Sequence, residues 1–282
     1  MTARKSPVPY FGAKGRTAPW IVSLLPPHQH YVEPYCGGLS VLLAKTPAAM
    51  ETVNDLDQEL MVFWRVLRDR PAELIRACAL TPHSRDELAA AHEPVTDPGD
   101  DLELARRIWC RLAQGRAGTL RNTGWRHYID PAGSTTGMPD YMAAYVDRLA
   151  AAAERLRRVS LESMPALDLI AKYGSHEDVL LYVDPPYLGT TRAFANYRHE
   201  MRSEDEHREL AAALADCKAA VVLSGYGSPL YGELYAGWHR ADRQTMTGNA
   251  RSGTKDRTEV LWSNRVLAGR LSLFDDEPEH AA

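Results

Sequence analysis

The fold is decided by the stretch HYVEPYCGG at residues 30–38, which reads as a short strand followed by a glycine-containing loop. An apolar segment from Leu39 to about Lys45 follows and predicts a helix. Strand, glycine loop and helix together begin a nucleotide-binding α/β unit. The stretch ETVND at residues 51–55 predicts a second strand. It ends in Asp55, at the spacing of roughly 20 residues at which such a unit places its ribose-binding acid. We therefore expect an α/β fold with a Rossmann-like sheet.

The glycine loop also narrows the class of ligand. It departs from the GxGxxG pattern of dinucleotide sites, so a nucleoside cofactor without a pyrophosphate fits it better. Two ordinary interpretations stay open. The loop can be a simple turn between a strand and a helix, and Asp55 can be a helix cap.

A carboxylate, two prolines and an aromatic ring follow the apolar run VLLYV at residues 179–183. Asp184 can accept a hydrogen bond from an amino group, and Tyr187 can stack on a ring. Pro185 and Pro186 stiffen the turn, and the Pro185 carbonyl offers a second acceptor. This combination suits a flat ring with an exocyclic amine. A strand that ends in an ordinary Asx-Pro turn has the same residues.

A mainly helical segment at residues 57–158 interrupts the α/β pattern and is interpreted as an insertion. It contains predicted helices at residues 57–69, 102–112 and 141–158, a capping-box signature at residues 84–87 and a long loop rich in Gly and Arg at 114–137. The α/β pattern then resumes. It predicts helices at 166–173, 203–217 and 229–235, and strands at 179–183, 219–224, 239–246 and 259–262. The acidic tail, residues 275–282, is expected to be disordered.

Composition and charge indicate a globular protein and give no sign of a membrane protein or a metalloprotein. The 282 residues are 45% apolar and 25% charged, as in an ordinary globular protein. The net charge of −4 hides two stretches, residues 1–32 and 106–128, that contain Lys or Arg and no acid. Such basic patches favour a polyanionic partner. The four cysteines and the histidines lack ligand spacing, so we expect reduced thiols, no metal site and a cytoplasmic protein. No signal peptide or membrane span is expected.

Several segments occur in a specific order: PYFGAKG, VEPYCGG, VNDLD, the helical insertion and YVDPPY. From about Pro9 to Trp262 this order resembles the Dam-like (alpha-class) DNA adenine-N6 methyltransferases. The resemblance implies S-adenosylmethionine as cofactor, S-adenosylhomocysteine as product and double-stranded DNA as partner. It also implies that residues 1–56 and 159–274 form a discontinuous catalytic domain with helices on both faces of its sheet, and that residues 57–158 form the target-recognition domain.

The resemblance assigns roles to individual residues. It implies that the cofactor site contains Tyr10, Lys14, Glu33, Pro34, Cys36, Gly37, Asp55 and Asp184. It implies that the target adenine is held by Asp184, Pro185, Pro186 and Tyr187. The amine would be oriented by hydrogen bonds to the carboxylate and to the Pro185 carbonyl, at a base flipped out of the duplex.

Arginines are the candidate DNA contacts, because Arg binds phosphate and reads guanine while Asn reads adenine. The residues proposed to contact DNA are Arg116, Arg121, Asn122, Trp125, Arg126, Arg192, Arg198 and Lys255. For Arg106, Arg107 and Arg111, a solvated helix face is an equal alternative.

The chain departs from the family pattern at two places. Residues 162–166 lack an Asp-Phe pair, so the contacts to the cofactor's adenine are not assigned. The insertion lacks the residues of GATC-specific members, so that target sequence is not expected.

Other functions remain as alternatives to adenine methylation. A cytosine-N4 DNA methyltransferase performs the same chemistry on another amine, and a non-catalytic DNA-binding protein can keep the fold. We expect a monomer or weak dimer without an obligate protein partner. Its expected setting is restriction-modification or phage DNA modification.

Overall fold

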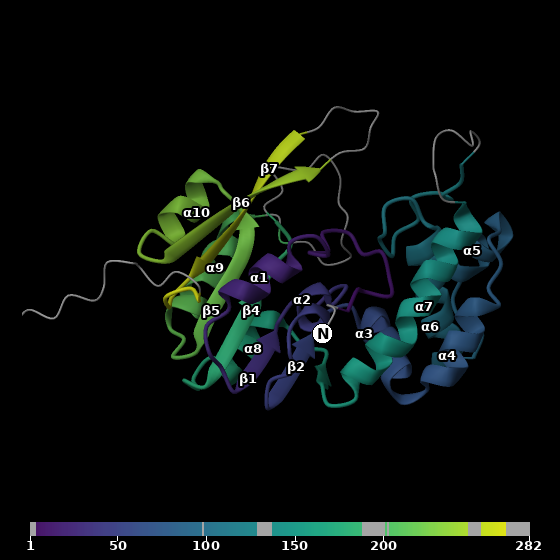
Figure 1. The fold of residues 1–282 in the computed structure, drawn as a ribbon, viewed down its shortest axis with the longest axis horizontal. Coiled ribbons are helices and arrows are strands. Elements are labelled where there is room, and N and C mark those ends of the chain that lie inside the picture. Colours follow the sequence, from purple (N-terminus) through teal and green to yellow (C-terminus); the bar gives the residue numbers. More distant parts are fainter. Residues whose placement is uncertain are drawn as a thin grey trace, which may run out of the picture.

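The computed structural model describes residues 4–97, 99–128, 137–187, 201, 203–247 and 255–268. Within these residues the chain forms a seven-stranded sheet with the order β3-β2-β1-β4-β5-β7-β6 (Figure 1). The strands are β1 (His30–Glu33), β2 (Met50–Asn54), β3 (Ser160–Glu162), β4 (Val179–Val183), β5 (Ala220–Tyr226), β6 (His239–Thr247) and β7 (Lys255–Ser263). The first five are parallel, whereas β7 runs antiparallel to both β5 and β6.

The strand order reverses between β1 and β4, which lie side by side in the centre of the sheet. In an open α/β sheet, ligands bind beyond the carboxyl ends of the strands at such a switch point. The loop 34–38 follows β1 and the stretch 184–187 follows β4. The Rossmann-like fold expected from the sequence is therefore confirmed, and it brings the two motifs together.

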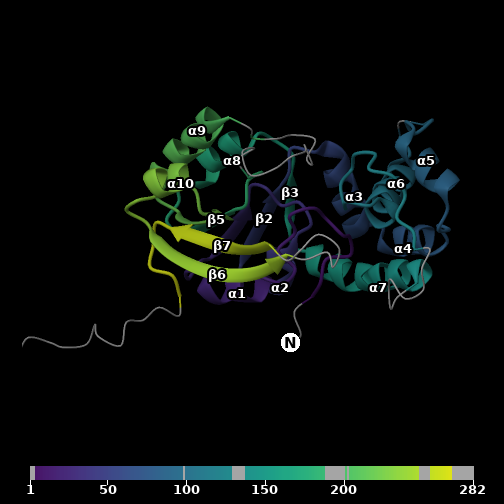
Figure 2. The same cartoon turned by 90° about the horizontal axis from the view of Figure 1, so that it is seen from above.

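Helices cover both faces of the sheet, because alternate strand residues point to opposite sides. In β4, Leu180 and Tyr182 join the core on one face, and Leu181 and Val183 join the core on the other. Figure 2 shows the two helical layers on opposite sides of the strands. The first face carries α1 (Ala18–Leu24) and α2 (Ser40–Ala44), and the second carries α8 (Ala166–Tyr173), α9 (Glu204–Ala215) and α10 (Pro229–Leu234).

The remaining helices gather at one side of the sheet (Figures 1 and 2). They are α3 (Gln58–Asp69), α4 (Pro71–Ala79), α5 (Arg85–His92), α6 (Asp101–Gln114) and α7 (Met138–Leu156). Asp57, Ser84 and Asp100 accept hydrogen bonds from first-turn N–H groups and so begin α3, α5 and α6. Trp64 and Trp109 are fully buried in a core that also includes Val53 of β2, so these helices and the sheet share one apolar core. The domain limits drawn from the sequence stay a prediction.

One buried ionic cluster fastens α7 to the sheet. Arg155 donates to both carboxylate oxygens of Glu51 in β2, with Nη2 at 2.7 Å from Oε1. The Lys45 ammonium lies 2.7 Å from the same carboxylate. The side chains of Arg155 and Glu51 are each 2% exposed. A buried carboxylate is tolerated when its charge is compensated and hydrogen-bonded in this way.

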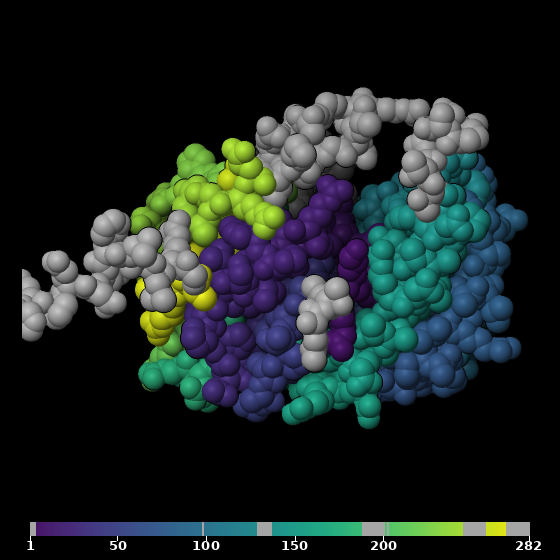
Figure 3. Space-filling model, in the orientation of Figure 1, coloured from purple at the N-terminus to yellow at the C-terminus, as the bar shows by residue number. Residues whose placement is uncertain are grey.

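The N-terminal segment lies between the helical block and the C-terminal strands on the face shown in Figure 3. It is tied to the helical block by a hydrogen bond from the Phe11 N–H to the Gly118 carbonyl, at 2.8 Å. Arg148 of α7 also donates to the Ser6 carbonyl. Across the described residues, no helix has both the length and the apolar character needed to span a bilayer.

Replacing Arg155 by Met is expected to destabilise the fold by about 3–5 kcal/mol, because Glu51 stays buried with only Lys45 beside it. Urea unfolding measures this loss. The matched control is Arg157→Met, on the same helix end, where the side chain is 71% exposed and pairs with Glu154 at 3.6 Å. That change should cost about 1 kcal/mol or less. Equal losses in the two variants would contradict a structural role for the buried cluster.

Candidate active site

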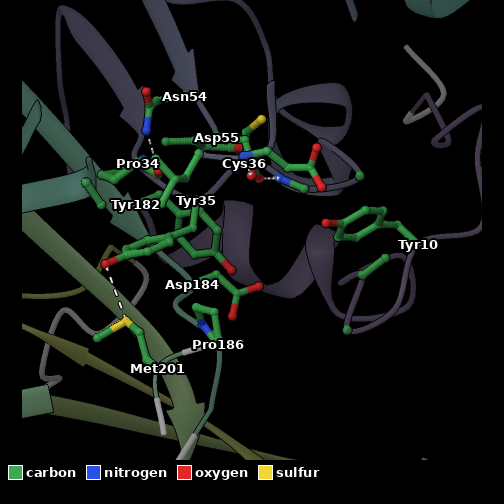
Figure 4. A pocket seen from close by; sticks show the side chains of 18 of the residues that line it. Tyr10, Pro34, Tyr35, Cys36, Asn54, Asp55, Tyr182, Asp184, Pro186 and Met201 are labelled. Atoms are coloured by element: carbon green, nitrogen blue, oxygen red, sulfur yellow. Dashed lines mark hydrogen bonds between the residues drawn. The ribbon is translucent and has the colours of Figure 1, made fainter. Parts of the chain in front are cut away.

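A pocket of about 580 Å³ opens at the switch point, beyond the carboxyl ends of β1, β2 and β4. It is lined by segments 10–14, 33–38, 54–57 and 165–167, together with Ser40, Val41, Tyr182, Asp184, Pro186, Met201, Glu206 and Glu209. Figure 4 shows Asp184 and Tyr10 pointing into the same space from distant parts of the chain. All eight residues expected to bind a cofactor therefore lie around one cavity, with Pro186 beside them.

The glycine loop is shaped by close packing against Tyr10. Gly37 has a φ of +44°, and a Cβ at this position would lie 2.9 Å from the Tyr10 ring. A Cβ at Gly38 would meet Tyr10 at the same distance. The Gly37 carbonyl accepts a hydrogen bond from the Trp64 indole at 3.0 Å. Only glycine fits these positions, so the loop can approach a ligand with its backbone.

Asp55 fixes the same loop from the end of β2. Its Oδ2 accepts from the Gly37 N–H at 3.0 Å, and its Oδ1 accepts from the Asp57 N–H at 3.0 Å. The cap of α3 is Asp57, so the helix-cap interpretation of Asp55 is wrong. Asp55 lines the pocket and joins the loop after β1 to the end of β2.

The loop before α8 forms a further wall that the sequence left unassigned. The Asn54 side chain accepts from the Met164 N–H at 2.9 Å and donates to the Met164 carbonyl at 3.0 Å. It also donates to the Pro34 carbonyl. This clamp places residues 165–167 at the pocket. The only hint in the sequence is that Asn54 directly precedes the strand-end acid.

Glu33 lies at the bottom of the site with its carboxyl group bonded inside the protein. It accepts from the Tyr31 hydroxyl at 2.5 Å and from the Leu42 N–H at 2.9 Å. Burial raises the pKa of Glu33 to about 8, although these two hydrogen bonds act in the opposite direction. Near neutral pH this group is therefore largely uncharged in the structure.

Asp184 forms a buried ion pair with Lys14. The Lys14 Nζ lies 2.9 Å from Asp184 Oδ1, and the two side chains are 7% and 19% exposed. Burial raises the pKa of Asp184 to about 6, and the Lys14 charge limits this rise. Burial lowers the pKa of Lys14, but Asp184 and Glu259 outweigh it and the pKa lies above its ordinary value. Lys14 therefore carries a proton and Asp184 is ionised at neutral pH.

Tyr187 is packed inside the protein. Its side chain is 5% exposed, and its ring contacts the edge of Tyr226 with centroids 4.5 Å apart. Its hydroxyl donates to Glu259 at 2.9 Å and accepts from Lys14. Neither Pro185 nor Tyr187 lines the pocket. Stacking of Tyr187 on a base stays a prediction, and it requires that a face of the ring become accessible.

Residues 115–125 form a hairpin-like loop in the helical block. Gly115 and Trp125 are paired by an antiparallel bridge, and the Arg116 N–H donates to the Gly124 carbonyl at 3.1 Å. Arg116, Arg121 and Asn122 are exposed. These three predicted DNA contacts therefore lie at the surface.

Two other predicted DNA contacts have partners within the protein. Trp125 stacks on the rings of His83 and His127, with centroids at 4.3 and 5.1 Å, and the Arg85 guanidinium lies over its ring at 4.4 Å. The Arg126 guanidinium donates to the Tyr141 hydroxyl and to the Arg116 carbonyl. These contacts hold the Trp125 ring and the Arg126 guanidinium against other parts of the protein.

The other arginines of the basic stretch also have internal partners. Arg106 pairs with Glu87 and Glu103, Arg107 pairs with Glu103, and Arg111 pairs with Glu59. The alternative that these three arginines form a solvated helix face is wrong, because their ion pairs are partly buried. Arg192 and Arg198 lie outside the described residues, and Lys255 begins β7. Among the described residues, no group of His, Cys, Asp and Glu has the arrangement of a metal site.

The fold and the pocket define an α/β protein with a small-molecule site at the switch point of its sheet. The model of the D12 class N6 adenine-specific DNA methyltransferases matches residues 10–248, and the chain belongs to this family. It is thus a methyltransferase that acts on N6 of adenine in DNA, and the family implies S-adenosylmethionine as methyl donor. The Dam-like resemblance of the ordered motifs is confirmed.

Similar proteins include the Type II methyltransferase M1.LlaDCHI of Lactococcus lactis subsp. cremoris, which is 28% identical over 270 residues covering 90% of this chain and 93% of the relative. A precorrin 8W decarboxylase structure from Methanobacterium thermoautotrophicum has a TM-score of 0.36 and 10% identity, covering 93% of this chain and 95% of that one. The rRNA methyltransferase aviRa from Streptomyces viridochromogenes has a TM-score of 0.36 and 14% identity, covering 90% and 86%.

Substituting Ala for Gly37 is expected to weaken binding of S-adenosylhomocysteine by about tenfold or more, because the new Cβ forces Tyr10 to move at the pocket wall. Titration calorimetry measures the affinity, and thermal denaturation shows that the variant is folded. The matched control is Gly15→Ala, where a Cβ meets nothing within 4 Å. An unchanged affinity in folded Gly37→Ala protein would argue against this loop as the cofactor site.

Proposed function

We propose that the chain methylates an adenine that has been flipped out of double-stranded DNA, with S-adenosylmethionine held in the pocket and the target amine held at Asp184. One observation supports this most strongly. The carboxylate of Asp184 lines the same cavity as the glycine loop after β1, so an amine at Asp184 lies beside any ligand cradled by that loop.

The lining of the pocket fits a cofactor that carries positive charge. Its described residues include the acids Asp55, Asp57, Asp184, Glu206 and Glu209 besides the largely uncharged Glu33, and Lys14 is the single basic residue among them. Because Lys14 is paired with Asp184, it is poorly placed to bind a pyrophosphate. The volume is in the range of roughly 300–1,000 Å³ that small-molecule sites usually have. When bound, S-adenosylmethionine supplies a methyl group already activated on a sulfonium.

In this proposal different residues of the pocket hold different parts of the cofactor. Asp55 holds the ribose hydroxyls, and the stretch from Glu33 to Gly37 surrounds the methionine portion. Tyr10 forms the wall beside this loop, where it packs against Gly37. Residues 165–167 at the start of α8, fixed by Asn54 through Met164, supply the wall beside the cofactor's adenine.

Asp184 acts on the target amine by orientation. The N6 lone pair is delocalised into the adenine ring and is a poor nucleophile. Hydrogen bonds from N6 to the Asp184 carboxylate and to the Pro185 carbonyl draw the nitrogen towards a tetrahedral geometry, which localises the lone pair. Fixed acceptors also stabilise the positive charge that develops on nitrogen. This mechanism needs an ionised Asp184 but no strong base.

Recognition of DNA is assigned to the loop at residues 115–125 and its neighbours. Arg116 and Arg121 are exposed and suit phosphate or guanine, and Asn122 suits adenine. Extrusion of the base costs a few kcal/mol, which these contacts help to offset. Arg192, Arg198 and Lys255 stay predicted contacts near the extruded base. We place the activity in restriction-modification or phage DNA modification.

Membership in an N6 adenine-specific family favours adenine over the cytosine-N4 alternative. Mass spectrometry of nucleosides from treated DNA distinguishes N6-methyladenine from N4-methylcytosine directly.

Asp184→Ala is expected to lower the single-turnover rate of DNA methylation by about 100-fold or more, because the amine loses its charged acceptor. Binding of a target duplex, measured by mobility shift, should change little. Asp216→Ala, at an exposed residue that follows α9 and does not line the pocket, is the control and should methylate at the wild-type rate. Near wild-type turnover in Asp184→Ala would rule out this mechanism.

The double reversal Arg116→Glu with Arg121→Glu is expected to weaken DNA binding and to reduce the slope of log affinity against log salt by about 2, one for each phosphate that the variant no longer neutralises. Affinities at several salt concentrations give the slope. Arg157→Glu, an exposed reversal that follows α7 outside the loop, serves as control. If the slope is unchanged in the double variant, the loop does not contact phosphate.

A further inference from the structure

Glu259 is a buried carboxylate to which the sequence assigned no role. It lies in β7, directly opposite Tyr226 of β5, and is 5% exposed. Its Oε1 accepts from the Ser224 hydroxyl at 2.6 Å and from the Tyr187 hydroxyl at 2.9 Å. It does not line the pocket. A carboxylate withdrawn from water on this scale stays ionised only beside a compensating charge.

The compensating charge is Lys14, which Glu259 shares with Asp184. The Lys14 ammonium lies 3.4 Å from Glu259 Oε1 and 2.9 Å from Asp184 Oδ1. It also donates to the Tyr187 hydroxyl and to the Gly12 carbonyl. The Lys14 ammonium is thus shared by Glu259, Tyr187 and Asp184.

We propose that Glu259 is a positioning residue for methyl transfer, which acts through Lys14 and Tyr187 to fix the orientation and the charge of the Asp184 carboxylate. The proposal rests on the proposed function of Asp184. Glu259 is not a catalytic residue, because it touches neither the pocket nor any ligand placed in it. Its contribution is to hold the lysine that neutralises and aims the acceptor.

The charges in this cluster determine the direction in which loss of Glu259 should shift the pKa of Asp184. A second negative charge beside Lys14 competes with Asp184 for the same cation. Burial, the Lys14 charge and the Glu259 charge set the pKa of Asp184 in that order, and Glu259 raises it. The groups that face Asp184 from the surrounding elements are Lys14, Glu33, Tyr182, Tyr187, Tyr231 and Glu259.

The wild-type protein should show an acid limb in its single-turnover rate near pH 6, because Asp184 must be ionised to accept from the amine. The rate is full above this pH and falls below it. In Glu259→Gln the competing charge is lost while the hydrogen-bonding shape is kept. The plateau rate should fall by about tenfold, because Lys14 is less firmly held, and the acid limb should move to lower pH by about one unit.

Two comparison variants separate this role from a general effect on the fold. Ser224→Ala removes one hydrogen bond to Glu259 but leaves its charge, so its acid limb should stay in the wild-type position. Lys14→Met removes the cation, so its acid limb should move to higher pH. Thermal denaturation and calorimetric binding of S-adenosylhomocysteine establish that the Glu259→Gln protein is folded and has an intact cofactor site.

A folded Glu259→Gln protein whose acid limb stays in place would overturn the inference while leaving the role of Asp184 intact. The same holds if its plateau rate equals that of the wild type. An Asp184→Asn protein with full turnover would instead overturn the proposed function, and the positioning role with it. The two failures are therefore distinguishable within one set of pH profiles.

Discussion

The buried ion pair between Lys14 and Asp184 connects parts of the chain that are far apart in sequence. Lys14 comes from the segment before α1, Asp184 follows the central strand β4, and Glu259 reaches the same ammonium from β7. In the proposed mechanism Asp184 accepts from a neutral amine and has to stay ionised, although burial favours its neutral form. The cation beside it limits this penalty. The antiparallel strand β7 thereby adds a contact to the ion pair at the end of a parallel strand.

Elements with a strong local signal could be predicted from the sequence. The strand at 179–183 and the helix at 166–173 have the predicted bounds. The strand is an apolar run that ends just before Asp184-Pro185, and the helix is an amphipathic segment that ends before Gly174. The edge strand β3 has three residues and exists only because it pairs with β2. Strand β7 begins at Lys255, four residues before its predicted start. Its first residues are polar and carry no strand pattern of their own, but they form a strand because they pair with β6.

The site could be predicted as a set of residues but not as a set of contacts. The motif order gathers Tyr10, Lys14 and Asp55 with the acid after β4, and the pocket contains them all. Which atoms they bond to depends on packing between segments distant in sequence. The partner of Lys14 is Asp184, and the Tyr187 ring is covered by Tyr226. Neither contact could be predicted from hydrophobic periodicity, because each joins residues far apart in the sequence.

The hydrogen bond between Phe11 and Gly118 restricts how the hairpin at residues 115–125 can be exchanged. Gly118 has a φ of +63°, and a Cβ there would lie 3.0 Å from the Pro9 carbonyl. The hairpin that presents Arg121 is therefore attached to the segment that carries Lys14. Exchange of the hairpin between relatives, by evolution or by grafting, has to preserve this glycine and its register against the N-terminal segment. A graft that matches only the exposed tip would disturb the segment that places Lys14 beside Asp184.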